Sequence, residues 1–310
     1  MGKTVFMFPG QGAQYVGMAK ELYDARSESR EIFERASKVT GLPMEELCFQ
    51  ENEKLHQTRY TQPALLTAIC AILKAVEKEN MHADMVAGLS LGEYAALVAA
   101  GALEFETAVD LVCKRGILME EAVPVGKGSM AAVISKKTLP IEQICAKTEG
   151  MVTVANYNCP GQQVISGEAE AVKKASETLM EEGAFRVVPL NVSGSFHSPM
   201  LKNAGEKLKT HLNELKIQQP KISFYSNVTA EEEKDSERIK DLLSQQVYSS
   251  VLWQQSIEEM IKNGADTFVE IGPGKTLSGF MKKINRSAVV YHVENLSELM
   301  ELAKKRRQEC

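Results

Sequence analysis

Short apolar runs alternate with longer stretches in which apolar residues recur at helical spacing along most of the chain. The runs that we interpret as strands are 5–8, 85–89, 222–225, 267–271 and 288–293. The stretches that we interpret as helices are 29–40, 63–78, 91–100, 105–121, 199–215 and 275–284. Strands that alternate with helices are typical of a parallel sheet with crossover helices, so the pattern predicts an α/β fold.

The middle of the chain follows a different order. The predicted elements there are, in turn, a strand at 129–134, a helix at 140–148, strands at 152–157 and 163–166, a helix at 169–182 and a strand at 185–190. This βαββαβ order is typical of a ferredoxin-like domain. We therefore expect a small domain at residues 126–194, inserted into a large domain whose two parts are residues 1–125 and 195–310.

Composition narrows the class of protein. The 310 residues, 44% of them hydrophobic, suffice for a large core, and the net charge of -5 lacks the basic excess of a general nucleic-acid binder. No apolar run reaches the roughly 20 residues that span a bilayer, and the first residues do not resemble a targeting signal. The six cysteines are scattered without metal-binding spacing. We expect a soluble, cytoplasmic protein that binds no nucleic acid, membrane or metal.

The strongest local motif is Gly-Leu-Ser-Leu-Gly at residues 88–92, which lies between a predicted strand and a predicted helix. The pattern G-x-S-x-G in this setting is typical of a nucleophile elbow, because the tight turn needs glycines and the helix N-terminus favours developing negative charge. The same letters also occur by chance at glycine-rich helix starts. With its context, the motif predicts that Ser90 is a nucleophile.

A serine hydroxyl is a weak nucleophile at neutral pH, so it needs a base within hydrogen-bond reach. Four of the five histidines fit ordinary positions in loops, a charged helix or a late strand: His56, His82, His211 and His292. His197 differs because it lies in a loop that leads into a helix, where a side chain can point into a cleft. Its position alone is equally consistent with a base and with a structural histidine.

A second glycine-rich turn, Phe-Pro-Gly-Gln-Gly at residues 8–12, follows the first predicted strand. Its backbone N–H groups could approach a ligand closely, which suits half of an oxyanion hole. Two nucleotide-binding motifs are incomplete, because Tyr15 stands at the third glycine position of a dinucleotide fingerprint and Val269 at the first glycine position of a P-loop. The sequence therefore favours neither kind of nucleotide-binding loop.

These motifs and several others resemble those of the malonyl-CoA:acyl carrier protein transacylase family. They follow the order of the family, and the resemblance spans nearly the whole chain. The motifs that carry the resemblance are Phe-Pro-Gly-Gln-Gly at 8–12, Gly-Leu-Ser-Leu-Gly-Glu-Tyr at 88–94, Arg-Gly at 115–116, Asn158 with Pro-Gly-Gln at 160–162, Phe-His at 196–197 and Glu-Ile-Gly-Pro-Gly at 270–274. The resemblance implies an α/β-hydrolase-like large domain with a parallel-sheet core and an inserted ferredoxin-like small domain, in agreement with the pattern of elements.

The resemblance also implies roles for individual residues. Ser90 is the acylated nucleophile and His197 is its general base and later its general acid. The backbone N–H groups of Gln11 and Leu91 form the oxyanion hole, where preset donors stabilise the charge of the tetrahedral intermediate. A main-chain carbonyl near Gln246 orients the imidazole, so no acidic third member of a triad is expected.

Substrate choice is implied to depend on Arg115. From its local sequence alone, we would interpret this residue as an arginine on the surface of a helix. The family position instead makes its guanidinium the ligand of the malonyl carboxylate, through two parallel charge-assisted hydrogen bonds. Without that carboxylate a buried Arg115 would be unpaired, so uncharged acyl groups should be rejected. Phe196 resembles the malonyl-type pocket of the family, and Asn158 is implied to bind substrate.

Two positions depart from the family pattern. Leu89 stands where the family usually has a histidine before the nucleophile, and Cys159 stands where it usually has a serine. Neither removes a catalytic group. Leu89 could change the turnover rate and the tolerance for other acyl groups, whereas a small buried hydrophobic residue is the simplest interpretation of Cys159.

The implied activity is transfer of malonyl from malonyl-CoA to the phosphopantetheine thiol of holo acyl carrier protein, by a ping-pong mechanism through a malonyl-serine ester. It would supply fatty-acid or polyketide chain extension, and the sequence does not separate these two pathways. The resemblance implies no cofactor besides the coenzyme A thioester, and a monomer. A basic face at Lys282, Lys283 and Arg286 could dock an acidic carrier protein.

Two other functions are compatible with the same fold. A serine hydrolase or thioesterase could be built on the same elbow and would release free malonate, although Arg115 argues mildly against it. A non-catalytic module that binds carrier protein would be favoured by the loss of a catalytic residue. Ser90, His197 and Arg115 are all present, so this interpretation is disfavoured.

Overall fold

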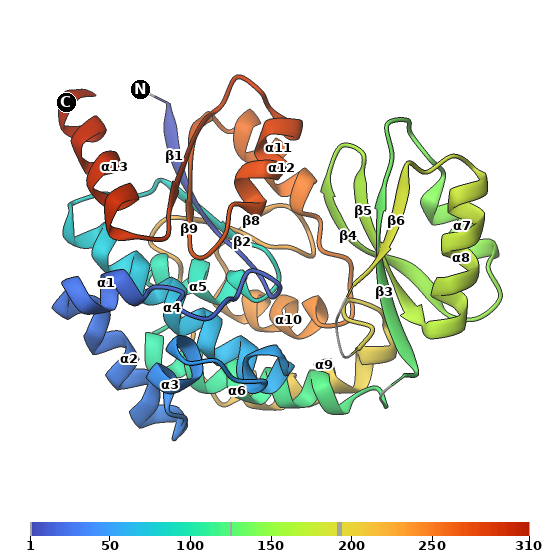
Figure 1. Cartoon of the computed structure of the whole chain (residues 1–310), viewed down its shortest axis with the longest axis horizontal. Coiled ribbons are helices and arrows are strands. Elements are labelled where there is room, and N and C mark those ends of the chain that lie inside the picture. Colours follow the sequence, from blue (N-terminus) through green and yellow to red (C-terminus); the bar gives the residue numbers. More distant parts are fainter. Residues whose placement is uncertain (1, 125, 191–193, 310) are drawn as a thin grey trace.

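The computed structural model describes residues 2–124, 126–190 and 194–309, and it confirms the α/β class with two separate sheets (Figure 1). The larger sheet has six strands in the order β10-β9-β1-β2-β7-β8. These strands are β1 (Lys3–Phe8), β2 (Met85–Gly88), β7 (Ser223–Tyr225), β8 (Glu232–Glu233), β9 (Ala265–Ile271) and β10 (Val289–Val293). All neighbours are parallel except β8, which runs antiparallel to β7.

Helices pack on the two faces of this sheet. They are α1 (Lys20–Ala25), α2 (Ser27–Thr40), α3 (Met44–Phe49), α4 (Thr58–Lys78), α5 (Gly92–Ala99), α6 (Phe105–Glu121), α9 (Lys202–Asn213), α10 (Ser236–Gln246), α11 (Trp253–Lys262), α12 (Thr276–Ile284) and α13 (Leu296–Glu309). Successive side chains of a strand point to opposite faces. Accordingly, Phe6 and Phe8 join the cluster that contains α2, α4 and α6, whereas Val5 and Met7 join that of α11 and α12.

The smaller sheet is antiparallel and has the order β4-β5-β3-β6. Its strands are β3 (Gly128–Ile134), β4 (Val152–Cys159), β5 (Gln162–Glu168) and β6 (Arg186–Pro189), with the helices α7 (Ile141–Lys147) and α8 (Ala169–Glu181). The two helices pack together on this sheet, to the right in Figure 1. The predicted βαββαβ order is therefore present. The domain boundaries stay a prediction, since residue 125 and residues 191–193 lie outside the described part.

Three details differ from the sequence prediction. The helix expected from Pro63 begins at Thr58, so the proline lies in its second turn. The helix expected at 199–215 is divided into a 3₁₀ turn at Pro199–Leu201 and α9. Strand β8 was not predicted, because two residues give no alternation to detect. None of the helices in the described residues is long and apolar enough to cross a membrane.

The fold positions the site by bringing two turns to one edge of the large sheet. Strands β1 and β2 are adjacent and parallel, and Phe8 pairs with Gly88 at the carboxyl end of both. The turn at residues 9–12 and the turn at residues 89–91 therefore leave the sheet side by side. Ligands of open α/β sheets bind at this edge, beyond the carboxyl ends of the strands.

Candidate active site

Ser90 lies on a sharp turn between β2 and α5. Its φ of 53° is in the left-handed region, which costs a residue other than glycine about 1–3 kcal/mol. Glycine is required on both sides of the turn because the chain passes so close to itself. A Cβ on Gly88 would lie 1.9 Å from the carbonyl carbon of Gly92, and a Cβ on Gly92 would lie 2.2 Å from the carbonyl oxygen of Phe8. This is the geometry of a nucleophile elbow.

His197 meets Ser90 across 107 residues of sequence. The Nε2 atom of His197 lies 2.8 Å from Oγ of Ser90, and its Nδ1 lies 2.7 Å from the main-chain oxygen of Gln246. A carbonyl oxygen can only accept, so Nδ1 carries the proton and Nε2 presents its lone pair to the serine hydroxyl. Burial, and next the charge of Arg115, lower the pKa of His197 to about 4. The imidazole is therefore neutral at pH 7 and can accept a proton.

The turn that carries Gln11 packs directly against the elbow. A Cβ on Gly10 would lie 2.5 Å from the carbonyl oxygen of Leu89, so only glycine allows this approach. Gln11 is also held by its side chain, whose Nε2 donates to Oγ1 of Thr58 over 3.1 Å. Leu91 is the N-cap of α5, and the first N–H groups of a helix have no partner within the helix. The backbone N–H groups of Gln11 and Leu91 thus belong to two turns that meet beside Ser90.

Arg115 is buried, with 1% of its surface exposed, so it is not a surface arginine. One guanidinium nitrogen donates to Oε1 of Gln62 over 2.8 Å, and the other donates to Oε1 of Gln246 over 2.9 Å and to Oγ of Ser90 over 3.2 Å. The expectation that Arg115 is unpaired without substrate therefore fails for its two terminal nitrogens, whereas its buried Nε has no hydrogen-bond partner. All three partners are neutral, however, and no carboxylate of the described residues forms a salt bridge with it.

These side chains face one cavity of about 210 Å³ between the two sheets. Among the residues that line it are Gln11, Ser90, Arg115, Asn158, Phe196 and His197. The Oδ1 atom of Asn158 is buried without a hydrogen-bond partner. Leu91 and Gln246 are not among the lining residues, but both adjoin the cavity through Ser90 and His197. The structure therefore brings together all eight residues singled out from the sequence.

Sequence reasoning missed a buried amide that holds the elbow. Oδ1 of Asn227 accepts the Ser90 N–H over 2.7 Å, and its Nδ2 donates to the carbonyl oxygen of Gly88 over 2.8 Å. Asn227 is fully buried and lies 137 residues from Ser90. Nothing in its local sequence distinguishes it from a loop asparagine. Gln62, which binds Arg115, was missed for the same reason.

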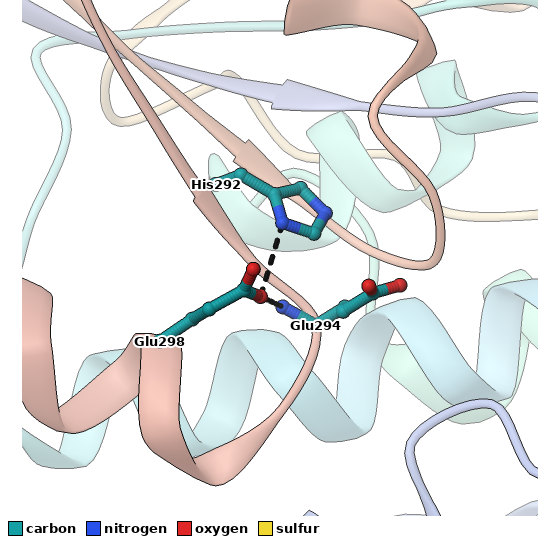
Figure 2. Close-up of side chains that lie close together, drawn as sticks. All are labelled: His292, Glu294 and Glu298. Atoms are coloured by element: carbon teal, nitrogen blue, oxygen red, sulfur yellow. Dashed lines mark hydrogen bonds and ion pairs between the residues drawn. The ribbon is translucent and has the colours of Figure 1, made fainter.

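The described residues contain one group of side chains whose atoms could together hold a metal ion, His292, Glu294 and Glu298 (Figure 2). Nδ1 of His292 lies 3.0 Å from Oε2 of Glu298. The other oxygen of Glu298 pairs with Lys275 at 2.7 Å, and Oε2 of Glu294 accepts from the Gly274 N–H over 2.8 Å. The carboxylates already have partners, so an ion-pair cluster explains this group better than a metal site does.

Known proteins resemble this chain over nearly its whole length. The model of the acyl transferase domain family matches residues 5–305. A malonyl CoA-acyl carrier protein transacylase of Bacillus subtilis is 45% identical over 307 residues, which cover 98% of this chain and 96% of the relative. The crystal structure of such a transacylase from Clostridium perfringens has a TM-score of 0.94 and 47% identity, and covers 99% of this chain and 98% of its own.

A solved complex of a type II PKS acyl-carrier protein with its malonyl-transacylase is also similar. It matches with a TM-score of 0.95 and 36% identity, over 98% of this chain and 99% of the other. The similarity thus extends over both sheets and over the elements that carry the cavity.

Proposed function

Since the chain belongs to the acyl transferase family, among the malonyl CoA-acyl carrier protein transacylases, we propose that Ser90 and His197 carry malonyl from coenzyme A to an acyl carrier protein. The proposal rests on the contacts of a single atom, Oγ of Ser90. Oγ of Ser90 faces the unprotonated nitrogen of His197 at 2.8 Å and a nitrogen of Arg115 at 3.2 Å. The nucleophile, its base and a fixed positive charge meet at a single oxygen.

In the first half-reaction, Oγ of Ser90 attacks the thioester carbonyl carbon of malonyl-CoA while its proton passes to Nε2 of His197. The carbonyl oxygen becomes an oxyanion, which the N–H groups of Gln11 and Leu91 stabilise. The carbon–sulfur bond then breaks, and the leaving thiolate takes the proton from His197. Throughout, the carbonyl oxygen of Gln246 holds the imidazole by Nδ1. The products are malonyl-Ser90 and coenzyme A.

The second half-reaction is the reverse with another thiol. The phosphopantetheine thiol of the carrier protein gives its proton to His197 and attacks the ester carbonyl carbon. The bond to Oγ of Ser90 breaks, and His197 returns the proton to the serine. These steps use only side-chain and backbone groups of the chain, so we propose that the reaction needs no metal or redox cofactor and that a monomer suffices.

Arg115 selects the acyl group in this proposal. Its guanidinium keeps its full charge against neutral partners, Gln62 and Gln246, in a buried cavity where electrostatic interactions are strong. The free carboxylate of malonyl supplies the missing negative charge. An acetyl group supplies none and only displaces hydrogen bonds, so it gains no comparable binding energy. Phe196 and Asn158 complete the pocket around the acyl chain.

We propose that the carrier protein docks beside the cavity, at helix α12. Helix α12 contributes Thr276 and Phe280 to the cavity lining. Lys282 and Lys283 are exposed at its C-terminal end, and Arg286 is exposed just beyond it. A positive face beside the entrance suits an acidic carrier protein and brings its phosphopantetheine arm toward Ser90.

The experiment that tests the proposal compares transfer with hydrolysis. Malonyl-CoA is supplied with and without holo carrier protein, and free coenzyme A, free malonate and malonylated carrier protein are each quantified. Without carrier protein, the proposal predicts that less than one equivalent of free malonate is released per enzyme. With carrier protein, it predicts that the amount of coenzyme A released equals the amount of malonylated carrier protein. Steady malonate release in both cases would instead establish a hydrolase.

A further inference from the structure

The side chain of Gln246 joins Arg115 to a buried carboxyl group that the mechanism does not use. Its Oε1 accepts from Arg115 over 2.9 Å. Its Nε2 donates to Oε2 of Glu93 and to the main-chain oxygen of Ser90, the latter over 2.9 Å. Gln246 is fully buried and Glu93 is 1% exposed, so water does not compete for these contacts.

Glu93 and the Ser90 carbonyl oxygen together determine the orientation of the Gln246 amide. A side-chain amide has an acceptor end and a donor end. The donor end of Gln246 meets the Glu93 carboxyl group and the Ser90 carbonyl oxygen, both acceptors, so its oxygen must face Arg115. The reversed amide would set its NH₂ group against the guanidinium and its oxygen against the Glu93 oxygen. The carboxyl group at position 93, together with the Ser90 carbonyl oxygen, therefore fixes the oxygen that holds Arg115.

Both carboxyl oxygens of Glu93 face hydrogen-bond donors. Its Oε1 accepts the backbone N–H of Asn227, while Oε2 accepts from Gln246. Burial raises the pKa of Glu93 to about 8, and these two hydrogen bonds, the charge of Arg115 and a hydrogen bond from Ser226 oppose that rise. The Glu93 carboxyl group thus contacts Gln246, which binds Arg115, and Asn227, which binds Ser90.

We propose that Glu93 is a positioning residue for malonyl recognition, acting through the Gln246 side chain to fix the guanidinium of Arg115. This inference rests on the proposed function, since it concerns how the same site chooses its acyl group. In the absence of the Glu93 carboxyl group, Nε2 of Gln246 keeps only the Ser90 carbonyl oxygen as a close acceptor, so the amide is held less firmly and Arg115 loses a fixed partner. Recognition of the malonyl carboxylate then weakens, while the chemistry at Ser90 remains possible.

A purely structural role for Glu93 makes a different prediction. Through Asn227, Glu93 also supports the turn at Ser90, because Oδ1 of Asn227 accepts the Ser90 N–H. If that support were its only role, the loss of Glu93 would slow acylation by malonyl-CoA and acetyl-CoA equally. The ratio of the two rates separates the roles, because only malonyl offers a carboxylate to Arg115.

The test measures kcat/KM for acylation by malonyl-CoA and by acetyl-CoA in the full chain and in Glu93→Gln. The matched control is Glu104→Gln, the same substitution at an exposed residue just before α6, the helix that carries Arg115. We expect the ratio of kcat/KM for malonyl-CoA to kcat/KM for acetyl-CoA to fall about tenfold or more in Glu93→Gln, which corresponds to the loss of one hydrogen bond to a charged group. The same ratio should stay unchanged in the control. An unchanged or higher ratio in Glu93→Gln would overturn the inference.

A second variant keeps the test decisive if Glu93→Gln folds poorly. Gln246→Leu removes the amide but keeps the main-chain carbonyl that holds His197. The inference predicts the same fall in ratio, and no further fall when Glu93→Gln is added. A further fall would show that Glu93 acts by another route. If the unaltered chain itself shows no malonyl preference, the proposed function fails first, which is a separate result.

Discussion

The base at the centre of the site should work at a lower pH than an ordinary histidine. His197 is 4% exposed, and its pKa is lowered to about 4, first by burial and then by the charge of Arg115. Acylation requires the neutral imidazole, so the rate is lost as the pH falls through the pKa of His197. At about pH 5.5, a base of pKa about 4 is about 97% neutral, whereas one at the ordinary 6.5 is about 9% neutral.

The assay is single-turnover acylation between about pH 3.5 and 8, read as malonyl-enzyme by rapid quench. We predict that the rate at about pH 5.5 stays within a few per cent of the plateau, roughly tenfold above the value for an unshifted histidine. Acetyl-CoA, whose acyl group has no carboxyl to titrate, is the substrate control. Circular dichroism at each pH confirms that the fold persists.

A variant identifies the cause of the shift. Arg115→Met removes a positive charge that opposes protonation of His197, so the midpoint of the acetyl-CoA profile should move upward toward 6.5. A midpoint near 6.5 in the unaltered chain would refute the reasoning about burial. A midpoint that does not move in Arg115→Met would refute the electrostatic part.

Three further predictions follow from the contacts. Arg115→Ala should lower kcat/KM for malonyl-CoA by about a hundredfold and kcat/KM for acetyl-CoA much less. Stopped-flow acylation with both thioesters measures this difference, and an equal loss for the two would contradict the prediction. Gly92→Ala should destabilise the fold by about 1–3 kcal/mol in urea denaturation, because its Cβ meets a backbone oxygen at 2.2 Å, whereas Gly279→Ala, with open space around it, should be neutral or stabilising. Joint replacement of Lys282 and Lys283 by glutamate should raise KM for carrier protein at low salt without slowing acylation by malonyl-CoA, and unchanged transfer would remove this face from the docking surface.

Local signals predicted the parts of the site that are set by local geometry. The elbow at Ser90 needs a strand, a tight turn and a helix within a few residues, and all three leave a trace in the sequence. Arg115 shows the limit of such signals, because an arginine in a helix ending in charged residues reads as exposed and only the packing of α4, α6 and α10 buries it. The resemblance to a family, and not the local pattern, gave its role.

The local sequence around Asn227 and Gln246 gives no signal of the distant contacts that these residues make. Asn227 meets Ser90 only after β2 and β7 pair, and Gln246 meets Glu93 across 153 residues. Glu93 did offer a signal, since it is an acidic residue in the otherwise apolar α5, one turn after the nucleophile. A buried carboxyl group in that position needs partners, and the structure supplies them.

The measurement that tests the central claim most directly is the intact mass of the protein after brief incubation with malonyl-CoA, for the unaltered chain beside Ser90→Ala. The account predicts one malonyl adduct per chain, located on Ser90, absent from Ser90→Ala and discharged by holo carrier protein. An adduct that persists in Ser90→Ala, or transfer to carrier protein without any adduct, would contradict it.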